Sequence, residues 1–205
     1  SSNSVGSGQV LTCPYSFEKA RLVIREMADL LALDLVDKRL VTDQLTLTVG
    51  YDIENLKNPE KKYSGEVTTD RYGRKIPKHA HGTINLKQQT SSAKKIVTAV
   101  MELYDRIMDR ELLIRRMYLA ANKVVPEEMI QEKETFEQLD LFTDYAALEK
   151  QKQQEEAVLE RERKMQEAML DIKKKFGKNA ILKGMNLQEG ATARDRNSRI
   201  GGHKA

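Results

Sequence analysis

The residues best suited to specific chemistry form a short apolar run, Gln138-Leu139-Asp140-Leu141-Phe142, within a polar and acidic stretch. A short extended segment of this kind can insert Leu141 and Phe142 as paired anchors into a groove on a partner protein. The Gln138 amide then forms directional hydrogen bonds at the rim of that groove. The alternative is that the same side chains hold a linker against its own domain. We expect docking on a partner.

Polar side chains also gather on one face of the strands that the sequence predicts. Leu45, Leu47 and Val49 alternate with polar residues, and Ile84 and Leu86 do the same. Such alternation predicts half-buried strands, with the apolar residues directed toward a core. The outward residues are Gln44, Thr46, Thr48, Thr83, Asn85 and Lys87. This face is either simply solvated or a binding surface, and the basic loops described below favour binding.

Helices follow from capping residues and apolar spacing. Ser16 is the candidate N-cap of a helix from Phe17 to about Leu35, in which apolar residues recur every three or four positions. Ser91 is the candidate N-cap of a second amphipathic helix. That helix is built on Ile96, Val100, Leu103 and Ile107.

Two further strands flank these elements. The first, from Ser4 to Leu11, is rich in glycine and serine, and Gly6 and Gly8 mark a place where another backbone can approach closely. The last strand runs from about Leu112 to Val124. It directs Met117, Leu119 and Ala121 inward, and Arg116 and Tyr118 outward.

The resulting order, βαββαβ, predicts an α+β domain over residues 1–125. Its natural form is a four-stranded, mostly antiparallel sheet with both helices on one face. The opposite face then remains open. The residues expected to be buried are Leu45, Leu47, Val49, Ile84, Leu86, Met117 and Leu119.

The longest predicted loop runs from Tyr51 to Gly82 and carries seven Lys and Arg residues. A loop of this length within a compact domain is either functional or mobile. His79 and His81 lie in it, but a metal site needs further ligands at suitable spacing. We therefore expect neither histidine to bind a metal.

Residues 126–205 form a C-terminal extension of different character. After the apolar run, the sequence predicts a long charged helix from about Tyr145 to Phe176, whose apolar positions are too sparse for a coiled coil. The last segment, from Lys173 to Ala205, carries nine Lys and Arg against two acidic residues. It is either a solvated, disordered tail or a contact for nucleic acid or an acidic partner.

Composition narrows the class of protein. The 205 residues are 40% hydrophobic and 32% charged, with a formal net charge of +4, which fits one medium domain and an extension. The single cysteine, Cys13, excludes an internal disulfide and favours a reducing cytoplasm. No apolar run approaches the roughly 18 residues of a membrane span, so we expect no membrane partner. Because the chain starts with serine and not with methionine, we expect a fragment.

Several segments resemble the little-finger domain of Y-family translesion DNA polymerases, most closely the UmuC-like branch of Gram-positive bacteria. The segments are Ser4-Val5-Gly6-Ser7-Gly8, Thr46-Leu47-Thr48-Val49 and Ile114-Arg115-Arg116-Met117, with Asn179–Gly184 and Arg196–Lys204 in the tail. The run at residues 138–142 resembles the peptide by which bacterial replication and repair proteins dock on the sliding clamp.

The resemblance implies a domain that lies across the template-primer duplex, with its sheet toward the major groove. Because a polymerase holds any sequence, its contacts should go to phosphate and sugar. The implied DNA-binding residues are Ser4, Gly6, Ser7, Gly8, Thr46, Thr48, Lys87, Arg115 and Arg116. The implied clamp-binding residues are Gln138, Leu139, Asp140, Leu141 and Phe142.

The resemblance also implies a role in DNA repair and damage tolerance, including the SOS response, in the bacterial cytoplasm. Polymerase chemistry belongs to the palm domain, where carboxylates bind two metal ions. Asp43, Asp52 and Asp70 are isolated in strand ends and loops. We therefore expect this fragment to be non-catalytic and to hold no cofactor, whereas the parent polymerase would use magnesium.

Two other classes of function stay open. One is a protein-interaction adaptor, whose helix and basic tail bind a recombinase or another subunit without touching DNA. The other is a module for single-stranded nucleic acid, although the predicted sheet face lacks a pair of aromatic residues for base stacking.

Overall fold

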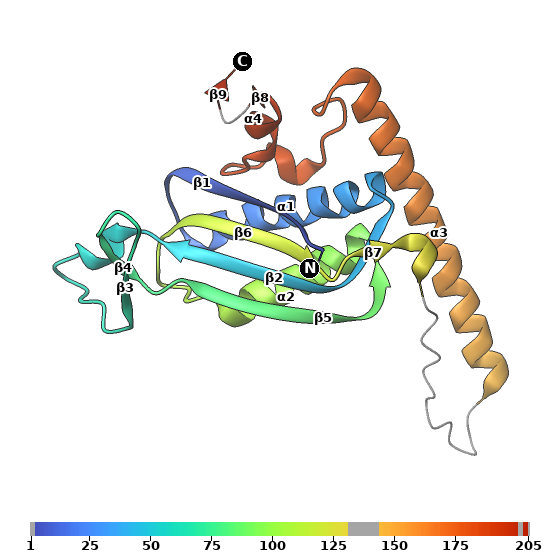
Figure 1. Ribbon diagram of the computed structural model, residues 1–205, viewed down its shortest axis with the longest axis horizontal. Coiled ribbons are helices and arrows are strands. Elements are labelled where there is room, and N and C mark those ends of the chain that lie inside the picture. Colours follow the sequence, from blue (N-terminus) through green and yellow to red (C-terminus); the bar gives the residue numbers. More distant parts are fainter. Residues whose placement is uncertain (1–2, 131–143, 201–202, 205) are drawn as a thin grey trace.

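In the computed structural model, residues 3–130, 144–200 and 203–204 are described (Figure 1). A mixed α+β domain forms the N-terminal part, as predicted. Its sheet is antiparallel, in the order β1 (Val5–Tyr15), β6 (Ile114–Asn122), β2 (Leu40–Tyr51) and β5 (Ala80–Thr90). A short strand, β7 (Val125–Pro126), pairs with the start of β2.

Both long helices of this domain pack on the same side of the sheet (Figure 1). Helix α1 (Phe17–Asp37) begins at Ser16, whose hydroxyl accepts from the Lys19 N–H, as expected. Helix α2 (Ala93–Ile107) begins one residue later than expected. Its N-cap is Ser92, whose hydroxyl accepts from the Lys95 N–H at 3.2 Å, and the neighbouring Ser91 has another role.

The core lies between the sheet and these helices. Five of the seven residues expected inside are at most 2% exposed, namely Leu45, Leu47, Val49, Met117 and Leu119. The other two, Ile84 and Leu86, are only partly buried, although they pack against the core. They lie on β5, which is an edge strand with one neighbour, and this leaves their outer side open to solvent.

The long basic loop contains ordered structure. It begins with the 3-10 turn η1 (Ile53–Leu56) and continues into a hairpin of β3 (Val67–Thr69) and β4 (Lys75–Pro77). Asp70 closes the hairpin, because its Oδ1 accepts from the backbone N–H groups of Tyr72 and Arg74. Gly73 adopts a φ of +76°, which favours glycine at that turn position.

The C-terminal extension packs beside the domain, where α1 contacts both its long helix and its shorter elements (Figure 1). The predicted charged helix is confirmed as α3 (Tyr145–Phe176). Shorter elements follow the helix and the sheet: η2 (Glu127–Met129), η3 (Gly184–Leu187), α4 (Ala193–Asn197), β8 (Arg199–Ile200) and β9 (His203–Lys204).

Polar contacts fix α3 to the start of α2. The Glu162 carboxylate accepts from the Ser92 hydroxyl at 2.6 Å and from the Lys94 N–H at 2.8 Å, so it lies at the positive N-terminal end of α2. Arg163 donates to the Ser91 hydroxyl at 3.0 Å and pairs with Glu127 at 2.8 Å. Ser91 therefore joins the two helices instead of capping one.

Residues 178–199, called the C-terminal strap below, are anchored by one buried carboxylate of α1. Glu26 is 1% exposed and accepts from the Asn186 amide at 2.6 Å and from the Thr192 N–H at 2.7 Å. It also accepts from the Ala193 N–H, so it lies at the start of α4. This carboxylate satisfies several donors that would otherwise lose hydrogen bonds on burial.

Two lysines of the basic tail pair with acidic residues of α1. Lys183 pairs with Asp29, and Lys174 pairs with Asp37. The sequence left open whether residues 173–205 are a disordered tail or a contact for a partner. A disordered tail is wrong for the described residues up to 199. The ion pairs of Lys174 and Lys183 neutralise part of the positive charge of this segment within the chain. Among the described helices, none has the length and apolar character that crossing a membrane requires.

Candidate nucleic-acid interface

The sheet has one face that the described helices leave open. We call this side, opposite α1 and α2, the outer face (Figure 1). The strand registers place Gly8, Tyr118, Thr48 and His81 in one row across it. Neighbouring rows contain Gly6, Ala120, Thr46, Thr83, Gln44, Asn122 and Asn85.

Side chains of adjacent strands bind one another across this face. The Thr46 hydroxyl lies 3.1 Å from that of Thr83 and accepts from the Asn122 amide at 2.6 Å. The Thr48 hydroxyl lies 2.8 Å from His81 Nδ1. These lateral bonds hold the hydroxyl groups in fixed positions, and each hydroxyl oxygen keeps capacity for a further partner.

Tyr118 lies over the two glycines of β1. A Cβ on Gly6 would lie 2.8 Å from Tyr118 Oη, and a Cβ on Gly8 would lie 3.1 Å from Tyr118 Cδ2. Tyr118 is 48% exposed. The glycines thus make room for an aromatic side chain on the outer face. The expected close approach of another backbone is present as well, because the Leu119 and Met117 carbonyl oxygens would lie 2.9 and 3.2 Å from the added Cβ atoms.

The basic residues lie toward the ends of the face. Arg116 is exposed, and its aliphatic part crosses Gly50, where a Cβ would come within 2.5 Å of Arg116 Cγ. Lys87 is exposed on β5, beyond the row of Asn85. Between them lie mainly neutral polar groups, so a polyanion crossing the face meets positive charge at both ends.

Two of the residues predicted to bind DNA do not point to this face. Arg115 falls where the pairing register shifts, and its Nε lies 3.8 Å from the buried carboxylate of Asp52. Ser7 pairs with the inward Leu119 and lines a pocket beside α1. The structure therefore brings Gly6, Gly8, Thr46, Thr48, Lys87 and Arg116 to one surface, with Ser4 exposed just before β1.

The tip of the β3–β4 hairpin carries two arginines close to an exposed aromatic ring. The guanidinium of Arg71 lies 4.8 Å from the centre of the exposed Tyr72 ring, and that of Arg74 lies 5.2 Å from it. Asp70 binds Arg74, and the hydrogen bond from the Arg74 backbone N–H is the main reason why the pKa of Asp70 is lowered. Arg74 is therefore paired with a carboxylate, whereas Arg71 forms no ion pair with a described acidic residue.

Two other predictions concern a metal site and the docking peptide. Among the described residues, no three His, Cys, Asp or Glu side chains gather as metal ligands would. The rings of His79 and His81 are 6.5 Å apart. The segment Gln138–Phe142 lies outside the described residues, so its docking role stays a prediction.

Comparisons with known proteins add three findings. Residues 2–141 match the family model described as the impB/mucB/samB family C-terminal domain. A search of curated proteins finds no match. Among solved structures, the chain is similar to one described as a complex of the beta-clamp processivity factor and the little finger domain of PolIV. That similarity has a TM-score of 0.37 and 9% identity, and it covers 69% of this chain and 100% of the other.

Proposed function

The chain belongs to the impB/mucB/samB family of C-terminal domains, the little-finger domains of Y-family DNA polymerases, and from that premise we propose a non-catalytic DNA-gripping role. In this proposal the outer face lies against template-primer duplex and holds it through phosphate and sugar. The polymerase chemistry and its magnesium ions belong to other domains of the parent protein, which acts in damage tolerance in the bacterial cytoplasm.

The observation that carries this proposal is the chemistry of the outer face. It is broad, open and polar, its hydroxyl groups are held by neighbouring strands, and cations lie toward both ends. Phosphate contacts position a protein on DNA without reading its sequence, which suits donors fixed on a rigid sheet. Tyr118 and His81 carry the two rings in the central row of the described face, and the His81 ring is already bonded to Thr48, which favours duplex over single strands that need several stacking rings.

We further propose that Gln138–Phe142 docks on the bacterial sliding clamp. Support comes from the residue pattern alone: two adjacent apolar anchors and an amide in polar surroundings. A clamp contact and a DNA contact on one chain would hold the polymerase on its template by two weak interactions instead of one strong one.

Duplex binding at several salt concentrations tests the DNA-gripping role. We expect weak binding that is equal for unrelated sequences and weakens steeply with salt, because bound phosphates release counterions. The combined substitution Lys87→Ala and Arg116→Ala should weaken binding to all duplexes alike, whereas Lys164→Ala on α3 should not. Tighter binding to single strands would favour the single-strand module, and absent or salt-insensitive binding would favour the adaptor.

A further inference from the structure

The free edge of β1 lies beside the C-terminal strap. Strand β1 is the edge strand and pairs only with β6 in the described sheet. The Gly8 carbonyl accepts from Arg196 Nη2 at 3.3 Å, so the peptide groups of Gly8 point to the free edge. Because strand residues two apart point their N–H and C=O groups in the same direction, the Gly6 N–H points there too.

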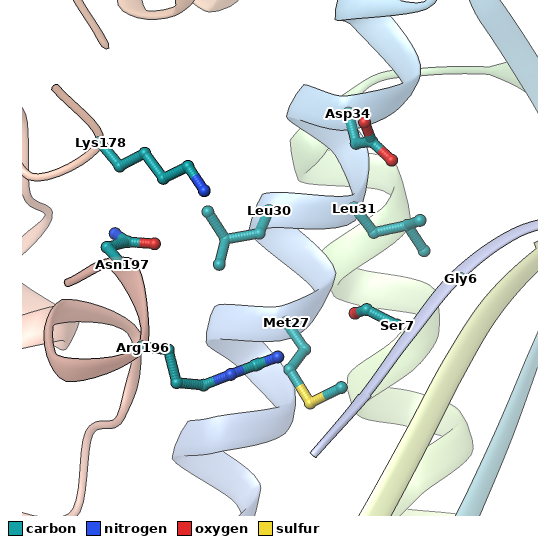
Figure 2. Close-up of a pocket in the computed structure, with 9 residues that line it drawn as sticks. All are labelled: Gly6, Ser7, Met27, Leu30, Leu31, Asp34, Lys178, Arg196 and Asn197. Carbon is teal, nitrogen blue, oxygen red and sulfur yellow. The ribbon is translucent and has the colours of Figure 1, made fainter. Parts of the chain in front are cut away.

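A pocket of about 280 Å³ lies between this edge, α1 and the strap (Figure 2). Ser7 lines it from β1. Lys178, Arg196 and Asn197 line it from the strap, and in Figure 2 the Lys178 and Arg196 side chains extend from the strap toward α1. The Met27 and Leu31 side chains, at 2% and 5% exposure, form a largely buried apolar base beneath the polar groups of the strap and of β1.

The two cations of the pocket lie outside the ion pairs of the described residues. Neither Lys178 nor Arg196 forms an ion pair with any described acidic residue, and the one acid lining the pocket, Asp34, pairs with Lys38 at 2.6 Å. Burial lowers the pKa of Arg196, the charge of Glu26 opposes this, and repulsion from Arg199 adds to the lowering. The Arg199 Nε is itself buried without a hydrogen-bond partner in the described chain.

The strap holds Arg196 in place before any ligand binds. Glu26 fixes the N–H groups of Thr192 and Ala193, and the Arg196 N–H donates to the Thr192 carbonyl one turn later at 3.0 Å. Thr192 also bonds to the Gln9 side chain of β1 at 3.2 Å. A guanidinium positioned in this way suits the planar, bidentate binding of an oxyanion.

We propose that this pocket, the edge site, binds a phosphate group of the nucleic-acid backbone that leaves the outer face across β1. The donors would be Arg196, Lys178, the Ser7 hydroxyl and the Gly6 N–H. This inference rests on the proposed DNA-gripping role. It assigns part of that role to residues beyond the 2–141 range that matches the family.

An acidic peptide is the competing occupant, because the free edge of β1 could accept an added strand. The apolar contact for such a peptide is small. Leu30 is half-buried and the residues beside it are buried, so little apolar surface is open to a peptide side chain. Phosphate needs no apolar contact.

Charge reversal at Lys178 tests the edge site, with Lys175→Glu as the matched control. Both lysines are exposed and close in sequence, but Lys175 lies by Phe176 outside the pocket. Measured on the full chain, Lys178→Glu should weaken duplex binding several-fold more than Lys175→Glu. The slope of log affinity against log salt should fall by about 0.9, the value for one lost phosphate. Equal effects of the two substitutions would overturn the edge site.

A second measurement separates this inference from the DNA-gripping role. Inorganic phosphate should shift the NMR amide signals of Gly6, Ser7 and Gly8 in the full chain, and Lys178→Glu should reduce the shifts. Shifts in a chain that binds no duplex would overturn the DNA-gripping role and the nucleic-acid source of the phosphate. Duplex binding without these shifts would overturn the edge site alone. If an oligoglutamate peptide produced these shifts at lower concentration than an oligonucleotide of equal charge, the pocket would be assigned to an acidic peptide.

Discussion

Tyr118 Oη lies directly above Gly6 of the neighbouring strand, so that a Cβ at residue 6 would stand 2.8 Å from this oxygen and 2.9 Å from the Leu119 carbonyl oxygen. The second of these atoms belongs to the backbone and cannot rotate away. The glycine is therefore required by packing on the outer face and not by its own backbone angles.

The first prediction concerns this contact. Gly6→Ala should lower the free energy of unfolding by about 1–3 kcal/mol, the usual cost of overpacking. Gly8→Ala should cost less, because its Cβ would meet Tyr118 Cδ2 at 3.1 Å and the Met117 carbonyl at 3.2 Å. Urea denaturation of both variants provides the measurement. A Gly8→Ala variant less stable than Gly6→Ala would contradict the packing described here.

The second prediction separates the two adjacent arginines of β6. Arg116→Ala should weaken duplex binding and leave stability unchanged, because its guanidinium is exposed. Arg115→Ala should instead lower stability by up to about 1 kcal/mol, since it removes the cation nearest to buried Asp52. Thermal melting and duplex titration of both single variants test this. Equal loss of DNA affinity in both would show that Arg115 also reaches the duplex.

The third prediction concerns the anchor of the strap. Glu26→Ala should leave the Asn186 amide and two backbone N–H groups without their acceptor, and release of the strap should follow. Hydrogen exchange at residues 184–197 should then become much faster, while exchange in β2 stays slow. Lys19→Ala is the control, because it removes the exposed pair with Glu189 of the strap and leaves every donor to Glu26 in place. Unchanged exchange in Glu26→Ala would mean that other contacts suffice to hold the strap.

The fourth prediction is a pH dependence. Arg21 binds both oxygens of Asp105, at 2.8 and 2.9 Å, and this hydrogen bonding is the main cause of the lowered pKa of Asp105. Because the folded-state pKa lies below the unfolded one, the stabilisation is complete above the ordinary pKa of about 4 and is lost as pH falls through the folded value.

Asp105→Asn should therefore be less stable than the unchanged chain at pH 7 and should lose less stability on acidification below about pH 4. Urea midpoints between pH 7 and pH 3 measure this difference. Glu160→Gln, an exposed change on α3, supplies the comparison. Parallel pH curves for Asp105→Asn and the unchanged chain would rule out a contribution from this pair.

The fifth prediction concerns the docking peptide. Leu141→Ala combined with Phe142→Ala should abolish binding to a sliding clamp and leave duplex affinity intact, because each buried anchor commonly contributes more than about 2 kcal/mol. A clamp pull-down and a melting curve on the same variant distinguish docking from internal packing. An unchanged pull-down with a lowered melting temperature would favour a linker held against its own domain.

The sheet and its helices could be predicted because burial imposes a period on each element. Thr46 and Thr48 face outward because the alternating Leu45, Leu47 and Val49 are buried. Helix α3 ends at Phe176, and Gly177 is its C-cap. Errors arose where two adjacent residues satisfy the same rule. Ser91 and Ser92 are both acceptable caps, and the contacts of α3 that distinguish them, Glu162 at Ser92 and Arg163 at Ser91, come from residues about 70 positions away in the chain.

Local patterns could not reveal the rest of the candidate site. The alternation in β6 fails at Ile114, which is buried although Arg116 two residues later faces outward, because the pairing register shifts at Arg115 and no residue type signals that shift. Glu26 looks like an ordinary solvated helix residue, since the groups that bind it lie 160 or more positions away along the chain. The edge site depends on that contact, so it becomes visible only in three dimensions.

The strap also matters for the choice of where a shortened chain should end. A chain ending at residue 141, where the family match stops, would lose Lys174, Lys183 and the donors to Glu26. Three carboxylates on α1, those of Glu26, Asp29 and Asp37, would then face water without partners. Such a fragment would carry an acidic patch on α1 that the full chain covers, on the side of the sheet opposite the outer face, so its surface charge would no longer represent that of the full chain.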